Sequence, residues 1–334
     1  MTAAVAVDLG KTGCRAVLWE GGAAPAHDVH EVPGAPGLAA GNGVALARAA
    51  VRAAVLPLLE RRPSLRLAAV CVGAAGAAAA PEAARELAGL LLEDLPADEV
   101  AVTSDAVTAH AGALGGRTGV VLAIGTGSVA IGIGDDGSYV RVDGWGPWLG
   151  DEGSGAWIGA AGLRAALRAH DGRGPDTALL SAAAARFGDP DRLPSAVGGD
   201  GNPARTAASF APDVARAAAE GDAAASAIVR DAATALGETV LAAARRVGGE
   251  DTLPVTITGG LTGLGEPLLG PLRSALADSS RPLHLQPPLG EPLDGARLLA
   301  LDASAPHEPH VARVRRSTSF PTVPTPPVTP PAVA

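Results

Sequence analysis

Three of the four tryptophans of this 334-residue chain lie in one short segment, residues 144–157, with five glycines and the adjacent carboxylates Asp151 and Glu152. Glycines let a backbone approach a ligand, tryptophans offer flat apolar faces, and carboxylates orient hydroxyls or hold a cation. The alternative interpretation is a tight turn before a helix, in which the tryptophans only fill the core. Polar groups beside aromatics in a glycine-rich loop favour a binding site for a sugar or a base.

A second glycine turn lies near the N-terminus, where the chain reads Asp8-Leu9-Gly10-Lys11-Thr12. Its end imitates a Walker A loop, but that motif requires a glycine where this chain has Val5. What remains is an aspartate after a strand, then a turn whose N–H groups and Thr12 hydroxyl can hold phosphate. Lys11, the only lysine of the chain, adds positive charge. A solvated hairpin turn is the alternative.

Two further glycine turns follow buried strands. Gly125-Thr126-Gly127-Ser128 repeats the arrangement of strand, turn with hydroxyls, and strand. Two such turns facing each other across a cleft would grip a polyphosphate from both sides. Gly259 and Gly260 follow a strand and precede a helix, which lets a base or ribose lie against bare backbone.

Ser104-Asp105-Ala106 places an acid where a strand ends and a helix begins. Asp105 suits an N-cap, but in a phosphate-binding cleft it could also accept a proton from an attacking hydroxyl, and the sequence leaves both roles open. The histidines form no pair at metal-ligand spacing. We expect surface or core positions for His27, His30, His110, His170 and His284.

Hydrophobic patterning predicts the same order of elements twice. In the first half we expect strands at 3–7, 14–20, 26–32, 66–72 and 99–103, with helices at 44–59, 81–92 and 105–114. In the second half we expect strands at 120–124, 129–133, 138–142, 255–258 and 283–285. Helices are predicted at 155–169, 177–187, 213–220, 223–246, 266–277 and 294–303. This indicates an internal duplication of architecture.

Length and composition narrow the class of protein. A chain of 334 residues suits two domains with a cleft between them. The net charge of -9, without a basic stripe, argues against nucleic-acid partners. Cys14 and Cys71 cannot form a disulfide framework, which fits a reducing cytoplasm, and no apolar run predicts a membrane span. Residues 304–334, rich in Pro, Thr and Ser, are expected to be a disordered tail.

Taken together, these motifs resemble the N-acetylglucosamine kinase branch of the BadF/BadG/BcrA/BcrD ATPase family, within the sugar kinase, Hsp70 and actin superfamily. The resemblance covers about residues 3–303, and Gly-Trp-Gly followed by Gly-Asp-Glu-Gly-Ser is its most specific part. It implies an α/β fold of two ribonuclease H-like (actin/hexokinase-type) domains with an interdomain cleft. We expect domains at 1–117 and 118–292, with the last helix, 293–303, as a candidate to pack back on the first.

The resemblance also implies roles for the motif residues. Gly10, Lys11 and Thr12 would contact the phosphates of ATP, Asp8 would lie near Mg²⁺, and Asp105 would take the proton from the 6-hydroxyl of the sugar. Gly125 and Gly127 would approach the phosphates, and Gly259 with Gly260 would lie against adenosine. The residues implied to border the sugar are Thr126, Gly144, Trp145, Gly146 and Asp151. A cleft that closes on a small-molecule sugar, and a homodimer, are implied as well.

The sequence departs from the family pattern in two places. Leu9 and Lys11 replace two glycines of the first turn, and Gly13 stands at the basic position. The asparagine that contacts the sugar in the family is missing around residues 36–38, and Asn42 lies too close to the predicted helix to replace it.

From the resemblance as a whole, we expect an ATP-dependent kinase for N-acetylglucosamine or a related amino sugar. The alternatives are an ATPase that activates a partner enzyme and a non-catalytic sugar sensor.

Overall fold

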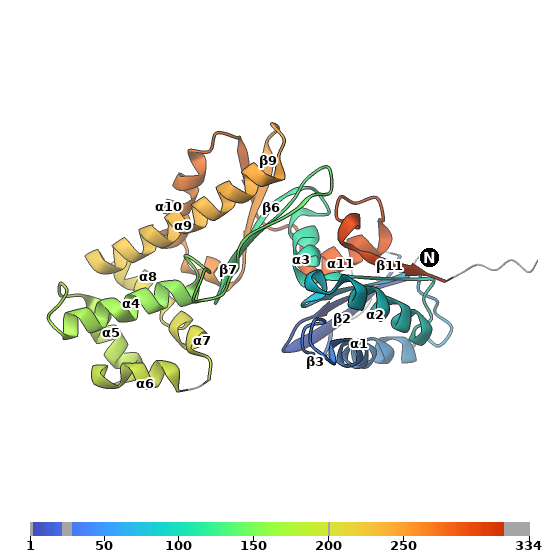
Figure 1. Cartoon of the computed structure of the whole chain (residues 1–334), viewed down its shortest axis with the longest axis horizontal. Coiled ribbons are helices and arrows are strands. Elements are labelled where there is room, and N and C mark those ends of the chain that lie inside the picture. The colour runs from blue at the N-terminus through green and yellow to red at the C-terminus, as the bar shows by residue number, and fades with distance from the viewer. Residues whose placement is uncertain (1–2, 22–28, 200, 317–334) are drawn as a thin grey trace, which may run out of the picture.

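The computed structural model describes residues 3–21, 29–199 and 201–316, which form two lobes, each built on a mixed β-sheet (Figure 1). The first sheet has the order β11-β5-β4-β1-β2-β3 and the second β10-β9-β6-β7-β8. The strands of the first sheet are β1 (Ala3–Leu9), β2 (Gly13–Glu20), β3 (His30–Pro33), β4 (Ala69–Ala74), β5 (Glu99–Ser104) and β11 (Ala312–Arg315). Those of the second are β6 (Gly119–Ile124), β7 (Ser128–Ile133), β8 (Tyr139–Asp143), β9 (Leu253–Thr258) and β10 (Leu283–Gln286).

Apart from β11, the two sheets have one topology. In each, three antiparallel strands connected by hairpins are followed by two parallel strands on the other side of the first strand. Parallel pairing needs a crossover, and helices supply it in both lobes. The predicted duplication of architecture is therefore confirmed at the level of strand order.

Both faces of the first sheet are buried. Side chains alternate along β1, so Val5 and Val7 pack with α1 (Gly43–Glu60) and α2 (Pro81–Asp94). Ala4 and Ala6 face α3 (Asp105–Leu114) and α11 (Pro292–Leu301). The chain thus returns to the first lobe after it has completed the second.

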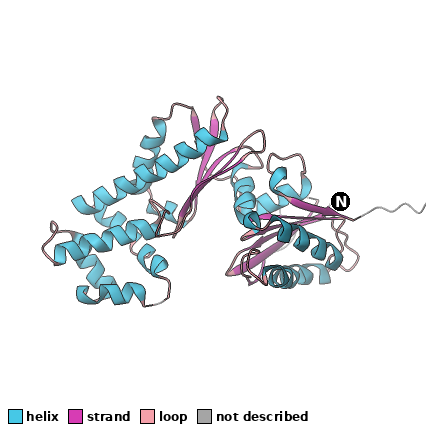
Figure 2. Cartoon of the chain, viewed as in Figure 1, coloured by secondary structure: helices cyan, strands magenta, loops and turns pink. Residues whose placement is uncertain are grey.

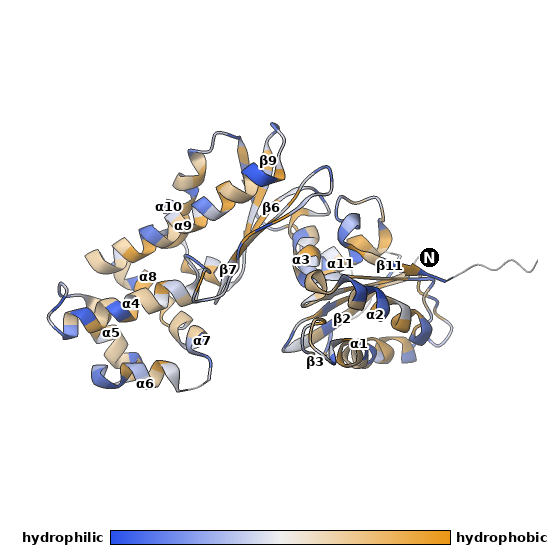
Figure 3. Cartoon of the chain, in the orientation of Figure 1, coloured by the Kyte–Doolittle hydropathy of each residue, from blue (hydrophilic) through white to orange (hydrophobic). Residues whose placement is uncertain are grey.

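The helices of the second lobe lie on the side of its sheet that faces away from the first lobe (Figure 2). They are α4 (Gly155–His170), α5 (Ala178–Phe187), α6 (Leu193–Gly198), α7 (Pro203–Ala208), α8 (Ala211–Ala219), α9 (Ala223–Val247) and α10 (Glu266–Ala277). Figure 3 shows hydrophilic residues on the outer parts of α2 and around α5 and α6. None of the helices in the described residues combines the length and apolar character that crossing a membrane requires. The opposite face of this sheet carries no helix of the second lobe and faces the space between the lobes.

The prediction of a disordered tail from residue 304 is wrong for its first part. Strand β11 pairs antiparallel with β5, and Arg313 within it is almost buried between Glu99 and Glu308. Burial of this ion-pair network and the added strand order a segment whose composition alone suggests disorder. Residues 317–334, and residues 26–28 of a predicted strand with His27, lie outside the described residues. Helices α6 and α7 were not predicted.

Candidate active site

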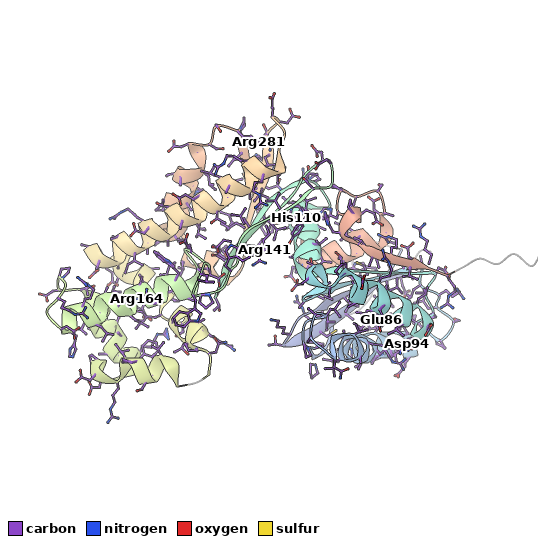
Figure 4. All side chains as sticks on the ribbon, in the orientation of Figure 1. Glu86, Asp94, His110, Arg141, Arg164 and Arg281 are labelled. Atoms are coloured by element: carbon purple, nitrogen blue, oxygen red, sulfur yellow. The ribbon has the colours of Figure 1, made fainter. Side chains whose placement is uncertain are left out.

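A cavity of about 510 Å³ lies between the two lobes. The first lobe contributes Asp8, Ser104 and Asp105 to its wall, and the second contributes the open face of its sheet. The residues of that face are Val121, Ala123, Val129, Ile131, Tyr139, Arg141, Gly144 and Thr258. Figure 4 shows His110 and Arg141 at this junction. Both lobes therefore enclose one shared space.

Asp105 is the first residue of α3, and its side chain is not the cap of that helix. The N-cap is Ser104, whose Oγ accepts the N–H of Val107 at 3.2 Å. The Asp105 carboxylate instead accepts the adjacent Ala106 N–H at 2.9 Å and lines the cavity. Burial, and to a lesser degree the negative charge of Asp8, raises the pKa of Asp105, although the Ala106 N–H and Lys11 oppose the rise. The carboxylate is thus a stronger base than an exposed aspartate.

Asp8 stands at the end of β1 with its side chain 19% exposed. Arg15 Nη2 donates to Asp8 Oδ2 at 2.7 Å, and Arg15 Nη1 lies 3.9 Å from Glu291 Oε2. Among the described residues no group of three or more His, Cys, Asp or Glu could hold a metal on its own. The Asp8 carboxylate, which lines the cavity between the lobes, nevertheless fits Mg²⁺, which usually takes one or two protein carboxylates and completes its shell with phosphates and water.

The first turn, residues 10–13, is closed by its own backbone. The Gly10 N–H donates to the Gly13 carbonyl at 2.9 Å, and Lys11 and Thr12 are exposed. Gly34, from the segment after β3, donates its N–H to the Thr12 carbonyl at 3.1 Å. A Cβ on Gly34 would overlap the Gly10 carbonyl oxygen and lie 2.6 Å from the Gly13 nitrogen. The turn therefore depends on a glycine behind it that the sequence analysis did not identify.

The second turn, residues 125–127, is fixed against the start of α4. The Gly125 N–H donates to the Gly127 carbonyl at 2.8 Å. The N–H groups of Gly155 and Ala156, in the first turn of α4, donate to the carbonyls of Gly125 and Thr126 at 2.8 and 3.1 Å. Thr126 is exposed.

A separate cavity of about 550 Å³ lies beside Gly259. Gly259 has a φ of 99°, and a Cβ there would overlap the Ile124 carbonyl oxygen, so the close approach of β9 to β6 requires glycine. Thr258 borders both this cavity and the one at Asp105. Two adjoining spaces thus run from the sheet junction to the loop after β10.

The tryptophans of the 144–157 segment are divided between surface and core. Trp145 and Trp148 are 65% and 91% exposed, and Leu149 is 85% exposed. Trp157 is partly buried and packs against the core of the second lobe. The Arg141 guanidinium lies 4.6 Å from the centre of the Trp145 ring. The exposed pair belongs to the loop after β8, so only part of the segment fills core.

Comparison with known proteins identifies the family. A family model described as the BadF/BadG/BcrA/BcrD ATPase family matches residues 5–279. The chain belongs to this family. A search of curated protein sequences found no match.

Solved structures share the fold, and one of them reaches 30% identity. A putative N-acetylglucosamine kinase from Chromobacterium violaceum is 30% identical over 90% of this chain and 99% of its own, with a TM-score of 0.66. A second putative N-acetylglucosamine kinase, from Porphyromonas gingivalis, is 22% identical over 88% and 96% of the two chains, with a TM-score of 0.64. A ROK family glucokinase from Streptomyces griseus, 20% identical over 90% and 99%, has a TM-score of 0.50. The predicted fold class and family are confirmed.

In this member of the BadF/BadG/BcrA/BcrD ATPase family, only some of the predicted site residues line the two cavities. Asp8, Asp105 and Gly144 line the cavity between the lobes, and Gly259 lines the adjoining one. The remaining predicted residues are not among the lining residues of either cavity in the described chain. These are Gly10, Lys11, Thr12, Gly125, Thr126, Gly127, Trp145, Gly146, Asp151 and Gly260.

The sequence analysis missed Tyr139 and Arg141 at this junction, and Gly34 behind the first turn. Burial raises the pKa of Tyr139, Arg141 lowers it, and the charge of Asp105 raises it, so Tyr139 lies within electrostatic reach of both. Tyr139 is the only tyrosine of the chain, which is a signal that the sequence did offer.

Proposed function

We propose that this protein is an ATP-dependent sugar kinase that phosphorylates the 6-hydroxyl of N-acetylglucosamine or a related amino sugar. The observation that carries the proposal is the position of Asp105. Its half-buried, more basic carboxylate faces a cavity that the glycine-rich second lobe also lines. The likeness to the Chromobacterium violaceum protein, at 30% identity over nearly its whole length, supports a carbohydrate substrate.

Phosphoryl transfer asks the protein mainly to position two substrates and to stabilise charge. Asp105 would accept the proton of the sugar hydroxyl as the hydroxyl oxygen bonds to the γ-phosphorus and the bond to the departing ADP oxygen breaks. The first turn (Gly10, Lys11, Thr12) and the second (Gly125, Gly127) would hold the phosphates. Asp8 would hold Mg²⁺, which when bound neutralises phosphate charge.

The remaining residues would select the two substrates. Thr126, Gly144, Trp145, Gly146 and Asp151 would contact the sugar. Gly259 and Gly260 would lie against adenosine, in the cavity that Thr258 joins to the site of transfer. We divide the chain into a first domain, 1–117 with 293–303, and a second, 118–292. We further propose a cytoplasmic homodimer that closes on its substrates.

An ADP-release assay tests the proposal. Purified protein with Mg-ATP is offered N-acetylglucosamine, glucosamine, N-acetylmannosamine, muramic acid and glucose, and the product is analysed for the position of the phosphate. Sugar-dependent ADP release with a 6-phosphate product supports the kinase. Release of ADP without any sugar would favour the ATPase activator, and sugar binding without release would favour the sensor. An activator of this fold would need cysteine thiolates to hold an iron-sulfur cluster. Burial raises the pKa of Cys14 and of Cys71 to about 12, which argues against such thiolates here.

A further inference from the structure

Asp143 is a buried carboxylate whose backbone lies in the left-handed region. It ends β8, is 9% exposed, and has a φ of 61°. Only glycine, asparagine and aspartate enter this region readily, and a buried charge is costly unless it is hydrogen-bonded. Such a residue persists because its surroundings fix it. Asp143 does not line either cavity of the site, although its neighbour Gly144 does.

The Asp143 carboxylate closes the loop of residues 144–150. The Asp151 N–H donates to its Oδ1 and the Glu152 N–H to its Oδ2, each at 2.8 Å. Ser128 adds a longer contact to Oδ2, at 3.5 Å, and donates to the Glu152 carbonyl at 2.9 Å. Charge-assisted bonds of this kind are stronger than neutral ones. One side chain thus joins the two ends of the loop and ties them to the start of β7.

The loop is shaped to admit this side chain. A Cβ on Gly150 would overlap Asp143 Oδ1 and lie 3.0 Å from the Trp145 Cβ, so only glycine fits there. At the base of the loop, Arg141 donates through Nε to the Asp143 carbonyl at 3.1 Å and through Nη2 to the Gly144 carbonyl. Backbone and side chain of Asp143 are therefore both held.

The result of this arrangement is the orientation of Asp151. Asp151 also has a left-handed backbone, with a φ of 54°, and its own N–H is the one that Asp143 Oδ1 accepts. Its Oδ1 accepts the Gly146 N–H at 3.3 Å. A Cβ on Gly127 would lie only 2.7 Å from Asp151 Oδ2. The carboxylate therefore packs directly against the second turn.

We propose that Asp143 is the positioning residue of the sugar side of the site. It fixes the Asp151 carboxylate beside the second turn and so determines sugar affinity, without touching substrate or taking part in proton transfer. This inference rests on the proposed function, because it assigns Asp151 to sugar binding. Hydroxyl groups are recognised by fixed acceptors, and an acceptor that must first be ordered binds more weakly.

Two substitutions separate the contributions of Asp143. Asp143→Asn keeps a residue that tolerates a positive φ but replaces one acceptor oxygen by an NH₂ group that faces an N–H donor. Asp143→Gly relieves the backbone and removes both acceptors. Asp136→Asn is the matched control, because Asp136 accepts the Ser138 N–H at 2.9 Å in the exposed turn before β8.

The first measurement is amide hydrogen exchange of Asp151 and Glu152 in the full chain without ligands. Loss of hydrogen bonds to a charged acceptor should speed the exchange of both by about 10- to 100-fold in Asp143→Gly, and of at least one of them in Asp143→Asn, which keeps one acceptor oxygen, with no change in Asp136→Asn. Unchanged exchange in Asp143→Gly would overturn the proposal that Asp143 holds the loop.

The second measurement is steady-state kinetics with the best sugar of the panel. The KM for the sugar should rise by about 10- to 100-fold in both variants, while the KM for ATP and kcat change by less than about threefold. A drop in kcat at unchanged sugar KM would overturn the role in sugar binding. If the wild-type protein phosphorylates no sugar, the proposed function and the sugar role both fail, and hydrogen exchange still decides whether Asp143 positions Asp151.

Discussion

His110 Nδ1 lies 2.9 Å from His307 Nε2, and both rings are buried where the two lobes meet. His110 Nε2 lies 3.0 Å from the Gly119 carbonyl, which can only accept, so His110 carries its proton on Nε2. Its Nδ1 then accepts from His307 Nε2–H. His307 Nδ1 is left bare, and this buried atom has no hydrogen-bond partner among the described residues. The chain of bonds links α3, the start of β6 and the C-terminal segment.

Acid should weaken this junction. Burial lowers the pKa of His110 to about 4, and burial with the nearby His110 lowers that of His307 to about 3. The unfolded chain titrates near 6.5, so it binds more protons than the folded chain as the pH falls below that value, and stability is lost. Above pH 6.5 the contribution is complete.

The variant His307→Gln isolates this effect, because its amide can still donate to His110 but does not titrate. Between pH 7 and pH 5 the wild type should lose about 2 kcal/mol more unfolding free energy than the variant. Urea unfolding at the two pH values measures the difference. Equal losses in both proteins would contradict the lowered pKa of His307 in the folded chain.

Asp105→Asn should lower kcat by about 10²- to 10⁴-fold, because the amide cannot accept the proton of the sugar hydroxyl. Its dissociation constant for Mg-ATP should stay within about threefold of the wild type. Rapid-quench kinetics and nucleotide titration measure the two quantities. A mutant with near-normal turnover would refute the general-base assignment.

The same residue predicts the acid side of the pH profile. Since the base must be ionised, kcat/KM for the sugar, which reports the ligand-free enzyme, should fall as the pH drops through the raised pKa of Asp105, at higher pH than an ordinary aspartate would give. Lys11 lowers this pKa, so Lys11→Met should move the acid limb further upward. An acid limb that does not respond to Lys11→Met would show that another group sets the profile.

The sequence predicted those features of the fold that depend on neighbouring residues, such as helix starts and tight turns. The apolar pattern after residue 105 predicted the start of α3, although the cap is Ser104 and not Asp105, and Gly10 with its neighbours predicted the first turn. Contacts between distant residues could not be predicted in this way. Strand β11 depends on Arg313 reaching Glu99, 214 positions earlier in the sequence, and the first turn depends on Gly34 from another segment. At β11, tertiary pairing overrode composition; at the first turn, it supports a structure that the local sequence already predicted.

Gly34→Ala should impair nucleotide use, because the added methyl group would displace the first turn from behind. A shift of about 1 Å in a phosphate-binding turn is expected to reduce kcat/KM for ATP by roughly 10- to 100-fold. Gly41→Ala is the control, since a Cβ there meets nothing within 4 Å. Initial rates at varied ATP measure the effect. Equal kcat/KM in both variants would mean that the turn does not contact the phosphates.

The ion pairs at the C-terminal strand should matter more than those on the surface. Arg313 is 8% exposed and contacts Glu99, Glu308 and the Leu299 carbonyl. Arg313→Met would leave Glu308 without this partner and Glu99 with Arg315 alone. Removing one member of a buried network typically costs about 3–5 kcal/mol.

The exposed pair between Arg66 and Asp98, whose side chains are 63% and 60% exposed, supplies the comparison. Arg66→Met should cost less than about 1 kcal/mol, because water screens such pairs. Chemical denaturation of the full chain measures both. A loss in Arg313→Met no larger than in Arg66→Met would mean that the ion pairs of Arg313 add little to the first lobe, and that β11 is held by its backbone pairing with β5 and its apolar contacts.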